Sequence, residues 1–254
     1  MADWLRCPEK RPLSAVRLFC FPHAGGSAAF YRSWAENAGV EIHAVQYPGR
    51  GDRWADPLIG DLRDMAHRIA DAMTPLLDRP VALFGHSMGA LVAYEVAREL
   101  AGRGVVPARL FVSGANPPQT MAGVLGSLAE TDDETLAGLM GTLNGTDPGL
   151  LADPELLEIV LSYVRSDLRA VAAYEHREGA PLDCPIHALH GDADHDVVPE
   201  RVPLWGELTR AGFTVDTLAG DHFYLVPRRE QVMEIITRYL HGGGGTGRRR
   251  QVDQ

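Results

Sequence analysis

The pentapeptide Gly85-His86-Ser87-Met88-Gly89 carries more information about this chain than any other segment. It follows residues 81–84, an apolar run with the length and residue types of a buried strand, and it precedes residues 90–100, which favour a helix. Glycines on both sides of the serine permit a sharp turn between strand and helix, because larger side chains there would clash with neighbouring backbone. We therefore expect Ser87 to lie between the carboxyl end of a strand and the N-terminus of a helix.

Strand-like and helix-like segments alternate along most of the chain. Helical spacing of apolar residues predicts helices at 54–77, 90–100 and 230–240. Short β-rich runs that end at glycine or proline predict six strands. The alternation indicates an α/β fold with a mostly parallel central sheet flanked by helices. The strands are expected at 16–21, 41–47, 81–84, 109–112, 185–189 and 213–218.

One long interval, 117–180, interrupts this alternation. It contains no strand candidate, only helical patterns at 134–143 and 154–174. A loop of this length without secondary structure would be unusual in a compact domain, so we expect a helical lid. The glycine- and arginine-rich end of the chain is interpreted as flexible. The predicted organisation is a core at 1–116 and 181–241, a lid insertion at 117–180 and a flexible tail at 242–254.

Composition excludes several classes of protein. The 254 residues are 45% hydrophobic and 23% charged, which is ordinary for a globular protein. With 24 basic and 34 acidic residues the net charge is −10, and an acidic chain is a poor binder of nucleic acid. No segment has the roughly 18 apolar residues of a membrane span, and the first residues lack the apolar stretch of a signal peptide. We expect a cytoplasmic monomer without nucleic-acid or membrane partners.

A serine nucleophile needs a base, and one of the ten histidines stands in a suitable place. His222 lies between the last predicted strand and the last predicted helix. Loops that follow parallel strands share one edge of the sheet, so His222 is expected beside Ser87 as the general base. His187 and His190 lie in or beside a strand and are interpreted as structural.

A carboxylate must orient the predicted base, His222, and three aspartates follow the predicted strand 185–189. In enzymes of the α/β-hydrolase fold the order along the chain is serine, acid, histidine. Asp194 is the leading candidate because it stands in a G-x-x-D pattern in the loop after this strand. Asp192 is the alternative, and we interpret the surplus carboxylates as capping or solvating the turn.

Residues 21–27, Phe-Pro-His-Ala-Gly-Gly-Ser, follow the first predicted strand and have small side chains that let substrate approach the backbone. We expect an oxyanion hole formed by the main-chain N–H groups of Ala24 and Met88. A phosphate-binding loop is the rival interpretation, but this segment matches neither glycine-rich phosphate motif. Together the elements predict a serine hydrolase that requires no metal and no cofactor.

Five segments together resemble the type II thioesterases that accompany polyketide synthases and non-ribosomal peptide synthetases. The resemblance extends from Leu18 to Leu240. The combination of FPHAGGS, YPGRG and GHSMG is far more specific than G-x-S-x-G alone. The segments that carry it are 21–27, 46–51, 84–89, 191–194 and 220–223.

The resemblance implies an α/β-hydrolase that releases acyl or aminoacyl groups from the phosphopantetheine thiol of an acyl or peptidyl carrier protein. Such enzymes clear misprimed or stalled units from the assembly line. The family's nucleophile, acid and base correspond to Ser87, Asp194 and His222. Its oxyanion amides correspond to Ala24 and Met88.

Docking of a carrier protein is expected to use local basic patches, because carrier proteins are usually acidic and so is this chain. Arg50, Arg53, Arg228 and Arg229 are the candidates.

Two other functions stay open at this point. A small-molecule carboxylesterase or acyltransferase would use the same three catalytic groups. A non-catalytic scaffold of the same fold would not need them.

Overall fold

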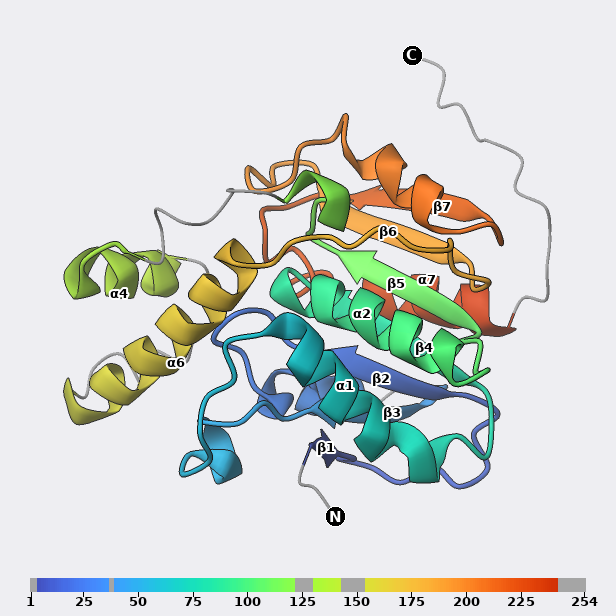
Figure 1. Cartoon of the computed structure of the whole chain (residues 1–254), viewed down its shortest axis with the longest axis horizontal. Helices are drawn as coiled ribbons and strands as arrows, with labels where there is room; N and C mark the ends of the chain where they lie inside the picture. The colour runs from blue at the N-terminus through green and yellow to red at the C-terminus, as the bar shows by residue number, and fades with distance from the viewer. Residues whose placement is uncertain (1–3, 37–38, 122–129, 143–153, 242–254) are drawn as a thin grey trace.

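A computed structural model describes residues 4–36, 39–121, 130–142 and 154–241 (Figure 1). Its strands form one sheet in the order β1-β3-β2-β4-β5-β6-β7. β1 is antiparallel to β3, and the other neighbouring strands are parallel. The predicted α/β fold with a mostly parallel sheet is therefore confirmed. The strands are β1 Leu5–Arg6, β2 Arg17–Phe21, β3 Glu41–Val45, β4 Val81–His86, β5 Arg109–Ser113, β6 Ile186–Gly191 and β7 Phe213–Leu218.

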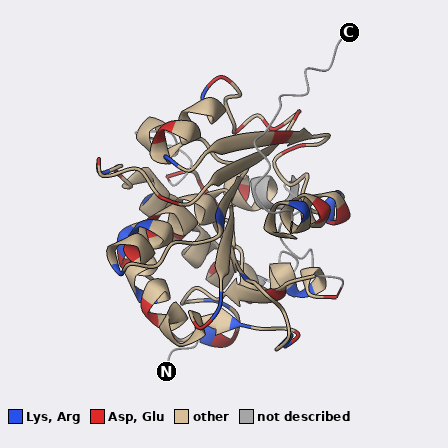
Figure 2. Cartoon of the chain, turned by 90° about the vertical axis from the view of Figure 1, so that its right-hand side faces the viewer, with Lys and Arg blue, Asp and Glu red and all other residues tan. Residues whose placement is uncertain are grey.

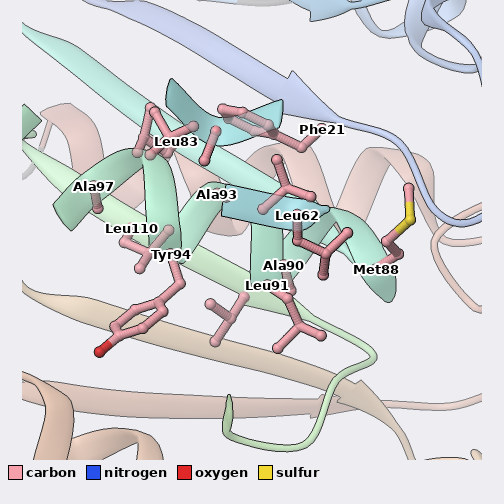
Figure 3. Close-up of a cluster of buried hydrophobic side chains, with 14 of the residues drawn as sticks. Phe21, Leu62, Leu83, Met88, Ala90, Leu91, Ala93, Tyr94, Ala97 and Leu110 are labelled. Atoms are coloured by element: carbon pink, nitrogen blue, oxygen red, sulfur yellow. The ribbon is translucent and has the colours of Figure 1, made fainter. Parts of the chain in front are cut away.

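Helices cover both faces of the sheet because the central strands are apolar on both sides. Phe19 and Phe21 of β2 belong to the core that contains α1 and α2, whereas Leu18 and Cys20 belong to the core that contains η1 and α7. Figure 3 shows side chains of α2 packed with Phe21 of β2 and Leu83 of β4. The helices that flank the sheet are η1 Ala28–Trp34, α1 Leu62–Met73, α2 Met88–Gly102, η5 Val202–Leu208 and α7 Arg229–His241.

The helix expected at 54–77 is shorter than predicted. Its α-helical part, α1, begins at Leu62 because the Asp61 side chain accepts hydrogen bonds from the N–H groups of Arg63 and Asp64, at 2.7 and 3.2 Å. Trp54, with 71% of its surface exposed, lies outside this helix.

The two-residue strand β1 and the 3₁₀ segments η1 and η5 were not predicted, since such short elements leave no periodic pattern.

The described parts of the interval between β5 and β6 contain helices and no strand. α4 and α6 pack on each other through a small apolar cluster that also contacts Ala24. They project beyond the edge of the sheet toward which β2 and β5 point (Figure 1). The elements are η4 Pro118–Thr120, α4 Asp133–Thr142 and α6 Pro154–Ala172. The predicted tail at 242–254 lies outside the described residues.

None of the helices in the described ranges combines the length and the apolar character that a membrane span requires.

The Asp61 cap gives a prediction about stability. Replacing Asp61 by alanine should lower the free energy of unfolding by about 1 kcal/mol, because two N–H groups of the first turn lose their acceptor. Urea denaturation measures this loss. Asp61→Asn keeps an acceptor oxygen and should stay near the wild-type value, whereas equal losses in both variants would contradict the capping role.

Candidate active site

Ser87 occupies the turn between β4 and α2, as the sequence predicted. Its backbone has φ +55° and ψ −122°, and no other described residue except glycine has a positive φ. This conformation costs about 1–3 kcal/mol and persists only where the surroundings enforce it. The Ser87 N–H donates to the Ser113 carbonyl at 2.8 Å, and the Ser87 carbonyl accepts from the Ala90 N–H at 2.9 Å. The turn is therefore held to β5 on one side and to α2 on the other.

Gly85 and Gly89 are required by close backbone packing. A Cβ atom on Gly85 would overlap the Gly89 carbonyl, and one on Gly89 would overlap the Phe21 carbonyl at the end of β2. The start of α2 thus lies directly against the segment that leads to Ala24. The two glycines bring Ser87 close to residues 21–27, the predicted oxyanion loop.

The Asp194 carboxylate lies against the His222 imidazole. His222 Nδ1 is 3.1 Å from Asp194 Oδ1 and 3.0 Å from Oδ2, and no part of the Asp194 side chain is exposed. Asp192 contacts the same loop differently, because its Oδ1 accepts a hydrogen bond from the Gly220 N–H at 2.9 Å. The geometry therefore favours Asp194 over Asp192 as the partner of the base, and Asp192 anchors the loop that carries His222.

The pKa of His222 is raised above its ordinary value. Burial alone lowers it, but the hydrogen bond and charge of Asp194, followed by the charges of Asp196 and Asp221, outweigh burial. Asp196 Oδ2 lies 3.7 Å from His222 Nδ1, and 63% of the Asp196 side chain is exposed. The carboxylates stabilise the imidazolium that forms when a base takes a proton.

His86 lies beside His222, with ring centroids 4.9 Å apart. Its Nδ1 is 2.9 Å from Ser113 Oγ, which is 2.7 Å from the Tyr224 hydroxyl. Burial lowers the pKa of His86 well below its ordinary value, and the neighbouring His222 and His23 lower it further. A neutral His86 does not repel a charged His222. Apart from a histidine next to the serine, no sequence pattern predicted this arrangement.

His222 makes its hydrogen bonds within the described residues through Nδ1, and Nε2 is the nitrogen that must face the nucleophile in a triad. In the same residues Ser87 Oγ makes no hydrogen bond, so the structure does not join Ser87 to His222 directly. Such bonds are commonly long or poorly aligned before substrate binds.

The structure places Ala24, one of the two predicted oxyanion donors, in the loop after β2 and Met88, the other, at the start of α2. Met88 is the first residue of α2, so its N–H has no partner within the helix. The Ala24 N–H makes no hydrogen bond to other described residues. Next to Ala24, the His23 ring packs on Phe223, with centroids 4.8 Å apart. The loops that carry Ala24, Ser87 and His222 therefore meet at one edge of the sheet.

Two groups of described side chains come close enough to share a metal ion, and neither is well suited to one. In the group Asp194, Asp196 and His222, the base and its acid already bind each other. In the group Cys7, Glu41 and His43, the Glu41 carboxylate is paired with the Arg17 guanidinium, whose charge opposes a cation.

The Thioesterase domain family matches residues 16–240 of the chain. Thioesterase PikA5 of Streptomyces venezuelae is 39% identical over 241 residues, which cover 93% of this chain and 85% of that protein. The chain belongs to the thioesterase family of α/β-hydrolases. The solved structure of the type II thioesterase BorB from the borrelidin biosynthetic cluster is 40% identical, with a TM-score of 0.85 over 93% of this thioesterase and 97% of BorB.

A more distant structure extends the comparison. YbtT, a type II thioesterase from the yersiniabactin NRPS/PKS pathway, is 26% identical, with a TM-score of 0.84 over 94% of this thioesterase and 99% of YbtT. A serine-to-alanine mutant of YbtT is also a solved structure. The thioesterase described here is accordingly a serine hydrolase of the type II group found in polyketide and non-ribosomal peptide clusters.

The position of Asp196 gives a prediction about pH dependence. A general base must be neutral, so kcat/KM should rise with pH through the pKa of His222. Asp196→Asn removes a negative charge that raises this pKa, and the rise should therefore move to lower pH, by about 0.5 unit. Rates measured from pH 5 to 9 test the shift. The matched control is Glu200→Gln, another exposed acid of this segment; a rise that moves equally in both variants would contradict the assignment.

Proposed function

We propose that this thioesterase hydrolyses acyl and aminoacyl thioesters on the phosphopantetheine arm of a carrier protein through an acyl-Ser87 intermediate. The observation that supports it best is the strained Ser87 turn at the same sheet edge as the Asp194–His222 pair. Removal of misprimed or stalled acyl units is the role that this chemistry serves in the family.

The proposed mechanism has two halves, formation of the acyl-Ser87 ester and its hydrolysis. His222 Nε2 takes the Ser87 proton as the oxygen attacks the thioester carbonyl, and Asp194 stabilises the imidazolium. The N–H groups of Ala24 and Met88 hold the oxyanion. As the carbon–sulfur bond breaks, the imidazolium gives its proton to the departing sulfur, and the thiol leaves. In deacylation, His222 takes a proton from the water that attacks the acyl-serine ester, and the imidazolium then gives it to the departing Ser87 oxygen as the carboxylic acid is released.

We further propose that α4 and α6 form the lid over the acyl group. The apolar cluster between them contacts Ala24, so an acyl chain bound at Ser87 would lie beside these helices. The length of acyl chain that fits depends on how they pack.

Two of the four arginines expected to contact a carrier protein are largely buried: Arg50, and Arg53, whose side chain is 11% exposed. Arg50 is only 3% exposed and cannot meet a carrier protein. Arg228 is exposed and Arg229 half-buried next to the His222 loop, so both stay candidates for contact with the acidic partner. Figure 2 shows basic and acidic residues interspersed along the ribbon of the helices, which favours a local contact over long-range attraction.

The direct test is hydrolysis of a panel of acyl-phosphopantetheinyl carrier proteins by wild type and Ser87→Ala. The variant should lose activity by roughly 10⁵–10⁶-fold, because the step that forms the acyl-enzyme is removed. Ser33→Ala, a half-buried serine outside the site, should keep wild-type rates.

The same assay separates this function from the alternative. Wild type should prefer carrier-bound thioesters to simple oxygen esters of the same acyl group. A strong preference for the oxygen esters would indicate a small-molecule esterase instead.

A further inference from the structure

Asp167 of α6 is a buried acid that the proposed mechanism does not use. Only 1% of its surface is exposed. A carboxylate in such a place is strongly unfavourable unless a cation and hydrogen-bond donors surround it. The partners of Asp167 therefore indicate which part of the molecule this carboxylate fixes in place.

The first partner is Arg50, from the YPGRG segment. Arg50 Nη1 and Nη2 donate to Asp167 Oδ2 and Oδ1 at 2.5 and 2.8 Å, a bidentate pair. The guanidinium also lies over the Tyr163 ring at 4.7 Å, and Nη1 donates to the Gly26 carbonyl at 3.3 Å. Arg50 thus connects α6 to the loop that contains Ala24.

The second partner is the backbone of that loop. The Gly25 N–H donates to Asp167 Oδ2 at 2.8 Å. Residues 23–26 form a turn closed by a hydrogen bond from the Gly26 N–H to the His23 carbonyl at 2.9 Å, and Gly25 has φ +79°. A positive φ at the third position only is the feature of a type II turn. The N–H of the central peptide is not used by such a turn, and Asp167 supplies its acceptor.

Ala24 is the second residue of this turn, and its N–H is the proposed oxyanion donor. The central peptide, which joins Ala24 to Gly25, can flip between type I and type II turns. A flip would point the Ala24 carbonyl at the Asp167 carboxylate, and the two oxygens would repel each other. The carboxylate therefore favours one form of the backbone on the carboxyl side of Ala24.

Packing of α6 reinforces this contact. A Cβ atom on Gly25 would lie 2.7 Å from Val164 Cγ2, so the helix touches the turn itself. Val164 and Asp167 are three residues apart and share one face of α6. The helix thus presents an apolar contact and a charged acceptor to the same turn.

We propose that Asp167 and Arg50 are positioning residues for the oxyanion hole. They hold the 23–26 turn in one place and one form, with the Ala24 carbonyl directed away from the Asp167 carboxylate. Because the Ala24 N–H is part of this turn, the lid helix α6 sets the geometry of the hole through these two residues. This inference rests on the proposed function, in which Ala24 is a donor.

The test compares Asp167→Asn with a matched control, Glu41→Gln. Glu41 also forms a buried ion pair, with Arg17 at 2.8 Å, but at the opposite, amino-terminal ends of β2 and β3. Kinetics are measured with a short acyl-phosphopantetheine thioester at a temperature where circular dichroism shows both variants folded.

Asp167→Asn should lower kcat by about tenfold or more, toward the 10²–10³-fold of a lost oxyanion donor, while KM changes by less than about twofold. Glu41→Gln should lose thermal stability and keep kcat. Arg50→Lys retains the charge and should lose less activity than Asp167→Asn. A purely structural role would instead lower kcat in both buried-pair variants alike.

A second readout does not depend on activity. Amide hydrogen exchange of Gly25, followed by NMR, should be faster in Asp167→Asn than in wild type and unchanged in Glu41→Gln. If Asp167→Asn does not fold, Arg50→Lys decides by the same two measurements. Wild-type protection of Gly25, or a kcat equal to that of Glu41→Gln, overturns the inference. A wild type inactive on thioesters would count against the proposed function, whereas the exchange rates would still test the contact.

Discussion

The positive φ of Ser87 is tolerated because the surrounding backbone leaves the chain no other route. β4 must end and α2 must begin within one residue, with Gly85 and Gly89 in contact with main-chain atoms on either side. The bond from the Ser87 N–H to the Ser113 carbonyl ties the turn to β5. The strain, about 1–3 kcal/mol, is offset by the core that α2 builds against the sheet. Every other part of the site is arranged around this fixed point.

Parallel strands place the remaining groups at the same edge. β2 leads to the 23–26 turn, β6 to Asp194 and β7 to His222, so the Asp194–His222 pair follows two adjacent strands. The two neighbouring imidazoles, His222 and His86, have opposite pKa shifts. Carboxylates raise the pKa of His222, while burial keeps His86 neutral. One face of α6 adds a further layer, because Asp167 accepts a hydrogen bond from the Gly25 N–H of the 23–26 turn.

Local patterns were sufficient to predict the six parallel strands and the helix after Ser87, since each depends on periodicity or on glycine. They also indicated Ser87, His222 and the choice between two aspartates. Long-range pairs left no such trace. Arg50 was interpreted as a surface residue because its partner, Asp167, stands 117 positions later in the chain. The helix was predicted to begin at residue 54, but it begins at Leu62, after the Asp61 cap. The prediction was wrong because Asp61 was not recognised as a cap.

The acyl-enzyme itself tests the central claim most directly. Wild-type protein is mixed with an acyl-phosphopantetheine thioester, quenched in acid within the first turnovers, digested and mapped by mass spectrometry. Our account predicts the acyl mass on the peptide that contains Ser87, attached to that side chain. Acyl groups found only on another residue, or turnover with no covalent intermediate at any quench time, would contradict it.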